Sequence, residues 1–213
     1  MKHALKRAID LIASLILLLA VLPVLAIASI AIVLSDGRPI SFRQERIGQG
    51  GRSLTVWKLR TMVVGASNKG LGHTVSHDDA RITRVGRFLR ASGIDELPQL
   101  FNVLAGDMSL VGPRPTLAYQ VAQYDAFQRR RLEMKPGITS LAVVSGRNAL
   151  LWQERIKLDV WYIDHWSIGL DLRILLRTLW KVLITREGLY GPDGVNDMFV
   201  AAPKQDEVER DAR

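Results

Sequence analysis

An apolar run near the N-terminus constrains this chain more than any other feature. Residues 11–34 are Ala, Val, Leu and Ile throughout, apart from Ser14, Pro23 and Ser29. The run exceeds the roughly 20 residues that a helix needs to cross a bilayer. It is also too long for the apolar core of a cleaved signal peptide. We therefore expect this segment to enter the membrane.

Pro23, at the midpoint of the run, favours a bent segment over a straight one. Proline removes one backbone hydrogen bond and kinks a helix. Basic residues flank both ends, and basic flanks are retained on the cytoplasmic side. These are Lys2, Lys6 and Arg7 before the run, and Arg38, Arg43, Arg46 and Arg52 after it. We expect a re-entrant helix that breaks at Pro23 and returns. A straight span is the alternative, because spanning helices tolerate proline.

The overall charge indicates an anionic partner. The chain has 29 basic and 21 acidic residues, which gives a net charge of +8. Nucleic acid, nucleotides and anionic membranes all fit such a balance. The chain has no cysteine, so disulfides and thiolate chemistry are excluded.

Two adjacent carboxylates, Asp95 and Glu96, stand just before a predicted helix start. Pro98 suits the first helical position, and Gly106 is expected to end a short helix that begins at Gln99. The positive end of a helix dipole favours phosphate. A carboxylate there can act as a nucleophile or hold a divalent metal. The alternative is a pair that only caps the helix.

Two further segments present cations. Pro113 and Pro115 fix the backbone around Arg114, which suits a bidentate grip on phosphate or stacking on a base. The alternative is a stiff turn with a surface arginine.

Residues 40–47 and 54–62 are predicted to form a hairpin around four residues that include three glycines. Lys58 and Arg60 would share one face of its second strand, where a solvated edge strand is the alternative.

Several amphipathic helices are predicted as well. One covers 82–91 with arginines along one side, and another begins at Thr116 and ends near Met134. Two more cover 152–166 and 168–186. Core packing and membrane docking both fit the last two. Residues 199–213 are charged, lack periodicity and are expected to be disordered.

Seven separated blocks together carry a family resemblance. They are 42–48 (FRQERIG), 57–62 (WKLRTM), 84–90 (RVGRFLR), 95–99 (DELPQ), 112–115 (GPRP), 135–139 (KPGIT) and 157–162 (KLDVWY). In this order they resemble the bacterial sugar transferase family, the small monotopic phosphoglycosyl transferases. The resemblance runs from about Lys6 to Gly188.

The resemblance implies an α+β fold in two parts. Residues 1–36 would form a re-entrant membrane helix that bends at Pro23. Residues 37–198 would form a mostly helical catalytic domain with a small β-hairpin and interfacial amphipathic helices. The protein would be monotopic, on the cytoplasmic face of the bacterial inner membrane. Relatives often have Ser-Pro at the bend, whereas this chain has Leu22-Pro23.

The resemblance also implies a reaction. A sugar 1-phosphate would pass from a UDP-sugar to polyprenol (undecaprenyl) phosphate through a covalent bond to Asp95, with release of UMP. Glu96 would act as a base or metal ligand, and Asp95 and Glu96 would hold Mg²⁺. The product would enter a bacterial glycoconjugate pathway.

Further residues take roles by the same resemblance. Phosphate or nucleotide contacts are expected from Lys58, Arg60, Arg90, Pro113, Arg114, Pro115 and Arg147, and Asp159 is expected to support the site. Residues 140–147 read SLAVVSGR, where relatives usually have GLAQVNGR. The loss of two amides leaves the identity of the sugar open.

The rival interpretation is a non-catalytic, membrane-anchored module that binds anionic lipid or nucleic acid. Composition fits it equally well, but it gives no reason for Asp95 and Glu96 among so many cations. The expected partners are therefore a UDP-sugar, polyprenol phosphate and membrane lipids, with no nucleic acid. The sequence allows an oligomer as well as a monomer.

Overall fold

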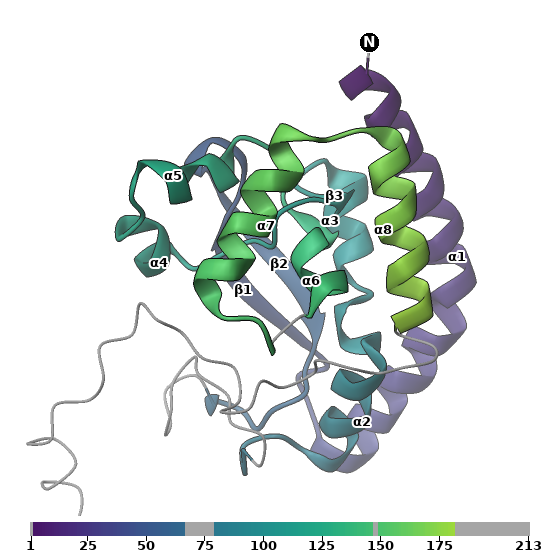
Figure 1. Ribbon diagram of the computed structural model, residues 1–213. Coiled ribbons are helices and arrows are strands. Elements are labelled where there is room, and N and C mark those ends of the chain that lie inside the picture. Colours follow the sequence, from purple (N-terminus) through teal and green to yellow (C-terminus); the bar gives the residue numbers. More distant parts are fainter. Residues whose placement is uncertain (1, 67–78, 147–148, 182–213) are drawn as a thin grey trace, which may run out of the picture.

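The computed structural model describes residues 2–66, 79–146 and 149–181 (Figure 1). A long N-terminal helix lies along one side of a mixed helical and β body, which confirms the predicted α+β class. The helices are α1 (Lys2–Asp36), α2 (Arg84–Ser92), α3 (Gln99–Ala105), α4 (Ala118–Ala122), α5 (Ala126–Arg129), α6 (Leu141–Ser145), α7 (Trp152–Asp164) and α8 (Ile168–Trp180). The strands are β1 (Ser41–Ile47), β2 (Ser53–Leu59), β3 (Ser109–Val111) and β4 (Gly137–Thr139).

Helix α1 is continuous through Pro23, so the expected break into two helices is not present. Its buried residues recur at intervals of three, four or seven positions and so form one stripe against the body, namely Lys6, Asp10, Ser14, Leu18, Leu25, Ala28 and Ile32. The stripe has members on both sides of Pro23, and this packing holds the helix together where one backbone hydrogen bond is lost. Among the described residues, α1 is the one helix long and apolar enough to cross a membrane.

Both ends of α1 are attached to the same body. Near its start, the Lys6 ammonium donates to Asp171 Oδ2 on α8 at 2.6 Å. At its end, Arg60 Nη2 donates to the carbonyl oxygens of Asp36 and Gly37 at 2.9 and 2.6 Å. A cation at this position satisfies carbonyl groups that have no partner within the helix and complements its dipole.

The predicted hairpin is present. Strands β1 and β2 pair antiparallel, with Ser41 opposite Leu59 and Ile47 opposite Ser53. A short 3₁₀ turn, η1 (Gln49–Gly51), connects them. Gly50, with φ of 66°, adopts the left-handed backbone that glycine allows.

The chain between the hairpin and α7 differs from the prediction in two places. Strands β3 and β4 form a parallel pair that the sequence pattern did not indicate. The single helix expected from Thr116 to Met134 is wrong, because α4, α5 and the 3₁₀ turn η4 (Arg130–Leu132) replace it. Asp125 starts α5 as its N-cap and accepts from the Gln128 amide at 2.8 Å. This local cap competes with a continuous helix.

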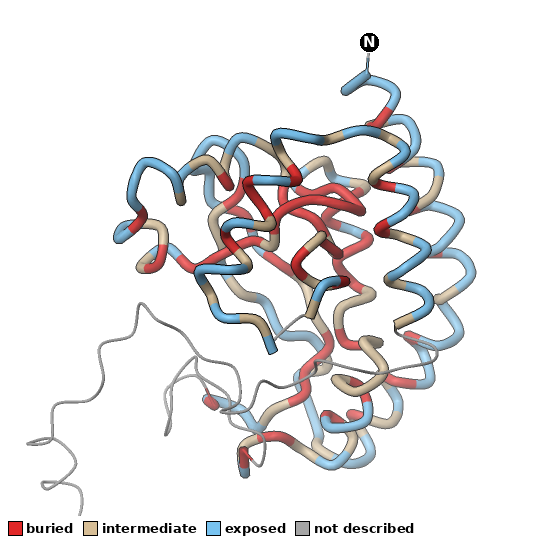
Figure 2. Tube along the Cα trace, in the orientation of Figure 1, coloured by how far each residue is buried: buried red, intermediate tan, exposed pale blue. Residues whose placement is uncertain are grey.

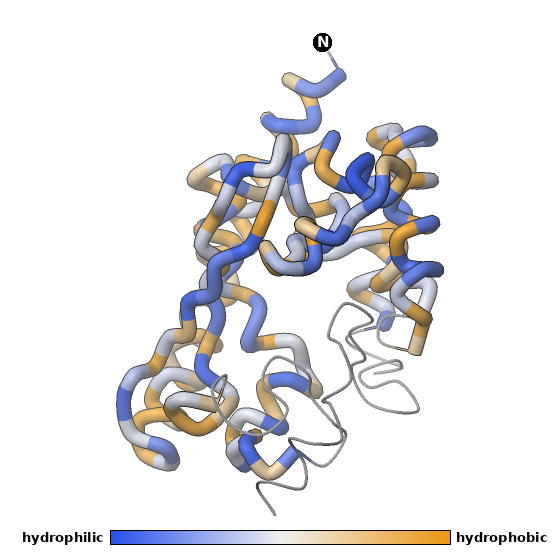
Figure 3. Tube along the Cα trace, turned by 90° about the vertical axis from the view of Figure 1, so that its left-hand side faces the viewer, coloured by the Kyte–Doolittle hydropathy of each residue, from blue (hydrophilic) through white to orange (hydrophobic). Residues whose placement is uncertain are grey.

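Many of the buried residues lie in the centre of the body, around α3, β3 and α7 (Figure 2). Apolar and polar residues alternate along much of the chain, as amphipathic elements require (Figure 3). Large apolar side chains nevertheless remain exposed on α8, namely Leu172, Leu176, Leu179 and Trp180. The outward side of α1 is equally apolar. Both helices therefore present apolar surface that the described part of the chain does not cover.

Candidate active site

The two predicted acids lie at a corner between α2 and α3. Gly93 ends α2 with a left-handed backbone, φ 72°. The 3₁₀ turn η3 (Ile94–Glu96) follows and leads through Pro98 into α3. Asp95 is 8% exposed. The corner thus presents both carboxylates beside the N-terminus of α3.

Glu96 is held by two cations from distant parts of the chain. Lys58 Nζ on β2 donates to Glu96 Oε1 at 2.9 Å. Arg114 Nη1 donates to Oε2 at 3.1 Å, and Arg114 Nη2 donates to Oε1. Burial opposes the charged form of Glu96, but Arg114 and Lys58 hold its pKa well below the usual value. These contacts favour the charged form of Glu96, which in turn fixes both cations.

Asp95 stands in a different environment. Within the described part of the chain, no group donates a hydrogen bond to its carboxylate. Burial, and then the negative charge of Glu96, raises its pKa to about 6, while Lys58, Arg90 and Arg114 act in the opposite direction. Asp95 is ionised above that pH and keeps its oxygen atoms available for reaction.

Arg90 approaches the acids from α2. Its Nε donates to Thr61 Oγ1 at 2.8 Å. The packing of α2 on this segment depends on Gly86, because a Cβ atom there would stand 2.0 Å from the Thr61 carbonyl oxygen. The position of Arg90 beside Asp95 therefore follows from a close approach that glycine permits.

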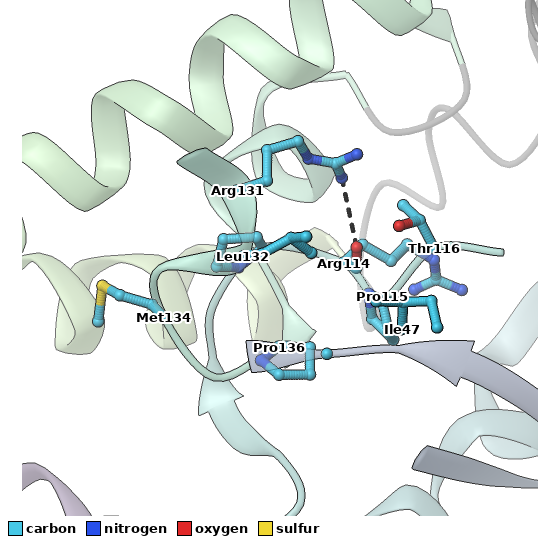
Figure 4. Close-up of a pocket in the computed structure, with 10 residues that line it drawn as sticks. Ile47, Arg114, Pro115, Thr116, Arg131, Leu132, Met134 and Pro136 are labelled. Atoms are coloured by element: carbon cyan, nitrogen blue, oxygen red, sulfur yellow. Dashed lines mark hydrogen bonds between the residues drawn. The ribbon is translucent and has the colours of Figure 1, made fainter. Parts of the chain in front are cut away.

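The corner Pro113-Arg114-Pro115 is supported from behind by Arg131 (Figure 4). Arg131 Nη2 donates to the Arg114 carbonyl oxygen at 3.3 Å, and Arg131 Nε donates to Asp159 Oδ2 at 2.9 Å. Asp159 is 1% exposed on α7. Burial raises the pKa of Asp159, whereas Arg131 acts in the opposite direction. The placement of Asp159 is consistent with the predicted supporting role.

A shallow pocket opens beside this corner (Figure 4). It is lined by Ile47, Gly48, Pro113, Arg114, Pro115, Thr116, Arg131, Leu132, Met134 and Pro136. Its walls come from β1, the Pro-Arg-Pro corner and the segment before β4. Arg114, one of the two cations that bind Glu96, thus lines this pocket as well.

Residues 1–185 match the family model described as bacterial sugar transferase. The chain belongs to the bacterial sugar transferase family.

Three named relatives are similar in sequence to this transferase over most of its length. It is 48% identical over 186 residues to the uncharacterized sugar transferase EpsL of Bacillus subtilis, covering 87% of this chain and 90% of the relative. It is 43% identical over 191 residues to UDP-glucose:undecaprenyl-phosphate glucose-1-phosphate transferase of Caulobacter vibrioides, with 84% and 70% covered. It is 37% identical over 201 residues to undecaprenyl-phosphate galactose phosphotransferase of Salmonella typhimurium, with 87% and 42% covered. The chain thus spans most of the first two relatives and less than half of the third.

The structure brings together most of the predicted site residues of this sugar transferase. Lys58, Arg90 and Arg114 surround Asp95 and Glu96. Arg60 is not part of this group, since its guanidinium binds the end of α1. Pro23 lies within α1, and Arg147 lies outside the described residues.

Sequence reasoning missed the residues that support the site from behind. Arg131 is the last of three consecutive arginines, and nothing in that run marks it as the buried one. Its partner Tyr124, whose hydroxyl accepts from Arg131 Nη1 at 2.6 Å, carried no signal either. The resemblance named Asp159, so a search for a buried cation to pair with it could have found Arg131.

The Asp159–Arg131 pair should be important for stability. Replacing Asp159 by Asn leaves a buried guanidinium without its counter-charge, and breaking a buried pair in this way costs about 3–5 kcal/mol. We expect a large fall in the free energy of unfolding, measured by thermal denaturation in detergent. Asp164→Asn is the matched control, because its pair with Arg130 is exposed and should contribute little. Equal effects of the two variants would contradict the assigned role of Asp159.

Proposed function

We propose that this protein transfers a sugar 1-phosphate from a UDP-sugar to polyprenol phosphate through a covalent aspartyl intermediate. The observation that carries the proposal is the difference between the two acids: among the described residues, no group donates a hydrogen bond to the Asp95 carboxylate, whereas Glu96 is bound to two cations. The named relatives from Caulobacter and Salmonella act on undecaprenyl phosphate, which supports this substrate class. The product would enter a bacterial glycoconjugate pathway.

In the first half-reaction, an Asp95 carboxylate oxygen attacks the phosphorus that bears the sugar. The bond from that phosphorus to the bridging oxygen of UMP breaks, and UMP leaves with the electron pair. Lys58, Arg90 and Arg114 surround the position where negative charge develops, and fixed cations in a partly buried site stabilise such charge. The pocket beside Pro113 and Pro115 is suited to hold the nucleotide.

In the second half-reaction, a phosphate oxygen of polyprenol phosphate attacks the same phosphorus. The bond between phosphorus and the Asp95 oxygen breaks, which restores the carboxylate and gives the polyprenyl diphosphate sugar. Splitting the transfer into two steps lets both substrates use one site in turn.

Glu96 is better suited to position cations than to act as a base. A general base works best with a pKa near the working pH, whereas the pKa of Glu96 is held well below its usual value by Arg114 and Lys58. Both of its oxygens already accept from these cations. We therefore assign Glu96 the task of holding Lys58 and Arg114 beside Asp95.

The difference between the two carboxylates also indicates which of them could bind Mg²⁺. Magnesium is usually bound by one or two carboxylates together with substrate phosphates. Asp95 fits as such a ligand, because its carboxylate has no hydrogen-bond donor among the described residues. Glu96 fits less well, since its oxygens are engaged. A bound Mg²⁺ would neutralise charge on the diphosphate.

The attachment of α1 supports a monotopic arrangement, and the basic residues that flank both of its ends favour the cytoplasmic face. A straight span would carry the two ends of a helix to opposite sides of the bilayer. Here Lys6, near one end, and Asp36, at the other, both contact the body that holds Asp95. The exposed apolar surfaces of α1 and α8 can then lie in the membrane while the acids face the headgroups.

Release of UMP tests the proposed reaction. Purified protein should release UMP from at least one member of a panel of UDP-sugars when Mg²⁺ and polyprenol phosphate are present. Asp95→Asn should release none while staying folded and membrane-bound, because an amide is a poor nucleophile. Absence of UMP with every sugar, or activity of Asp95→Asn at the native level, would refute the proposal.

Cysteine labelling tests the membrane arrangement. The chain has no native cysteine, so single cysteines can be placed at the exposed positions Lys2 and Ser35. In intact cells both should be protected from a membrane-impermeant reagent, and both should react after lysis. Labelling of one position alone in intact cells would indicate a straight spanning helix instead.

A further inference from the structure

Asn102, in the middle of α3, makes an unusual connection to the hairpin. Its side chain is buried, with the residue 3% exposed. The Trp57 amide donates to Asn102 Oδ1 at 3.2 Å, and Asn102 Nδ2 donates to the Thr55 carbonyl oxygen at 2.7 Å. Thr55 and Trp57 are alternate residues of β2, so these groups point to the same side of the strand. The Asn102 amide thus replaces the peptide group that a third strand would supply.

The main chain of Asn102 is fixed as well. Its carbonyl oxygen accepts from the amides of Gly106, Asp107 and Met108 at 3.1, 3.0 and 3.2 Å. These bonds close the C-terminal end of α3 and turn the chain toward β3. Because the backbone of Asn102 is fixed in this way, α3 and β2 cannot slide past each other without breaking the two partly buried hydrogen bonds that its side chain makes to β2.

The central ion pair of the site joins β2 to the turn that precedes α3. Lys58 directly follows Trp57 on β2, and Glu96 lies in the turn that leads into α3. A lysine side chain is long and flexible, so the position of its ammonium depends on how its backbone is held. The 2.9 Å contact between Lys58 Nζ and Glu96 Oε1 therefore depends on the register of β2 against α3.

We propose that Asn102 is a positioning residue: its amide sets the register of β2 against α3 and so places Lys58 between Glu96 and the reacting phosphate. The part of this proposal that concerns the contact between Lys58 and Glu96 rests on the geometry alone. The consequence for the rate rests on the proposed function.

Asn102→Asp tests this role with almost no change in shape. The aspartate can still accept from the Trp57 amide, but it has no N–H for the Thr55 carbonyl oxygen and turns a carboxylate oxygen toward it. The register should loosen at this point. Asn102→Ala, made in parallel, removes both bonds without adding charge.

A double-mutant cycle separates positioning from general destabilisation. Thermal midpoints are measured for Lys58→Met, Glu96→Gln and the double variant, first with native Asn102. Here the midpoint shifts should be clearly non-additive, because the double variant loses one shared contact. In the Asn102→Asp and Asn102→Ala backgrounds, the shifts should become additive. Unchanged non-additivity in both backgrounds would overturn the proposal.

Ser109→Ala provides the matched control for the cycle. Ser109 is fully buried, and its hydroxyl donates to Asp10 Oδ2 on α1 at 2.8 Å. Its loss should destabilise the protein without moving β2 against α3. The coupling of Lys58 with Glu96 should therefore persist in this background. If it disappears there as well, the coupling reports stability alone, and the assignment of Asn102 is wrong.

A rate measurement tests the link to the reaction. Displacement of a reacting group by about 1 Å can cost about 100-fold, so Asn102→Asp should slow formation of the phosphosugar-enzyme roughly 10- to 100-fold. In a Lys58→Met background the same change should add little. A rate equal to the native rate would contradict the positioning role. If the native protein forms no phosphosugar-enzyme, the proposed function fails, while the thermal cycle still decides the role of Asn102.

Discussion

The pairing of Glu96 with Lys58 and Arg114 is the interaction on which the site depends. A buried carboxylate is costly unless cations and hydrogen bonds compensate it. Here the compensation brings together β2, the η3 corner and the Pro-Arg-Pro segment. It also separates the two acids chemically: Glu96 stays charged and bound, whereas burial and the charge of Glu96 raise the pKa of Asp95 to about 6. Adjacent carboxylates in unlike environments can take different tasks.

The segments that carry this pairing are also connected to helix α1. Arg60, two residues after Lys58, binds the carbonyl groups at the end of α1. At the other end, Lys6 reaches Asp171 and the Val111 carbonyl oxygen, close to the segment that leads to Arg114. Helix α1, which would enter the bilayer, is therefore attached at both of its ends to the body that holds Asp95 and Glu96. This attachment would fix the height of the site above the membrane and bring a lipid phosphate and a soluble nucleotide sugar to the same carboxylate.

Local signals explain what the sequence could predict. The β1–β2 hairpin and the end of α3 at Gly106 followed from turn glycines, whose effect is confined to a few residues. The parallel pairing of β3 with β4 joins two short segments far apart in the chain, which periodicity does not detect. Arg60 and Asn102 were missed or misassigned for a related reason. Their roles come from the elements packed against them, and an arginine that binds a helix end has the same sequence signal as one that binds phosphate.

The central claim is that Asp95 alone becomes bonded to the phosphosugar, and intact-protein mass spectrometry tests it most directly. The native protein and Glu96→Gln are incubated with a UDP-sugar and Mg²⁺ in the absence of polyprenol phosphate, beside Asp95→Asn. The account predicts an added mass of one phosphosugar on the first two, mapped to Asp95, and none on Asp95→Asn. An adduct on Asp95→Asn, or one mapped to Glu96, would contradict it. So would a native protein that never forms an adduct and requires both substrates bound together.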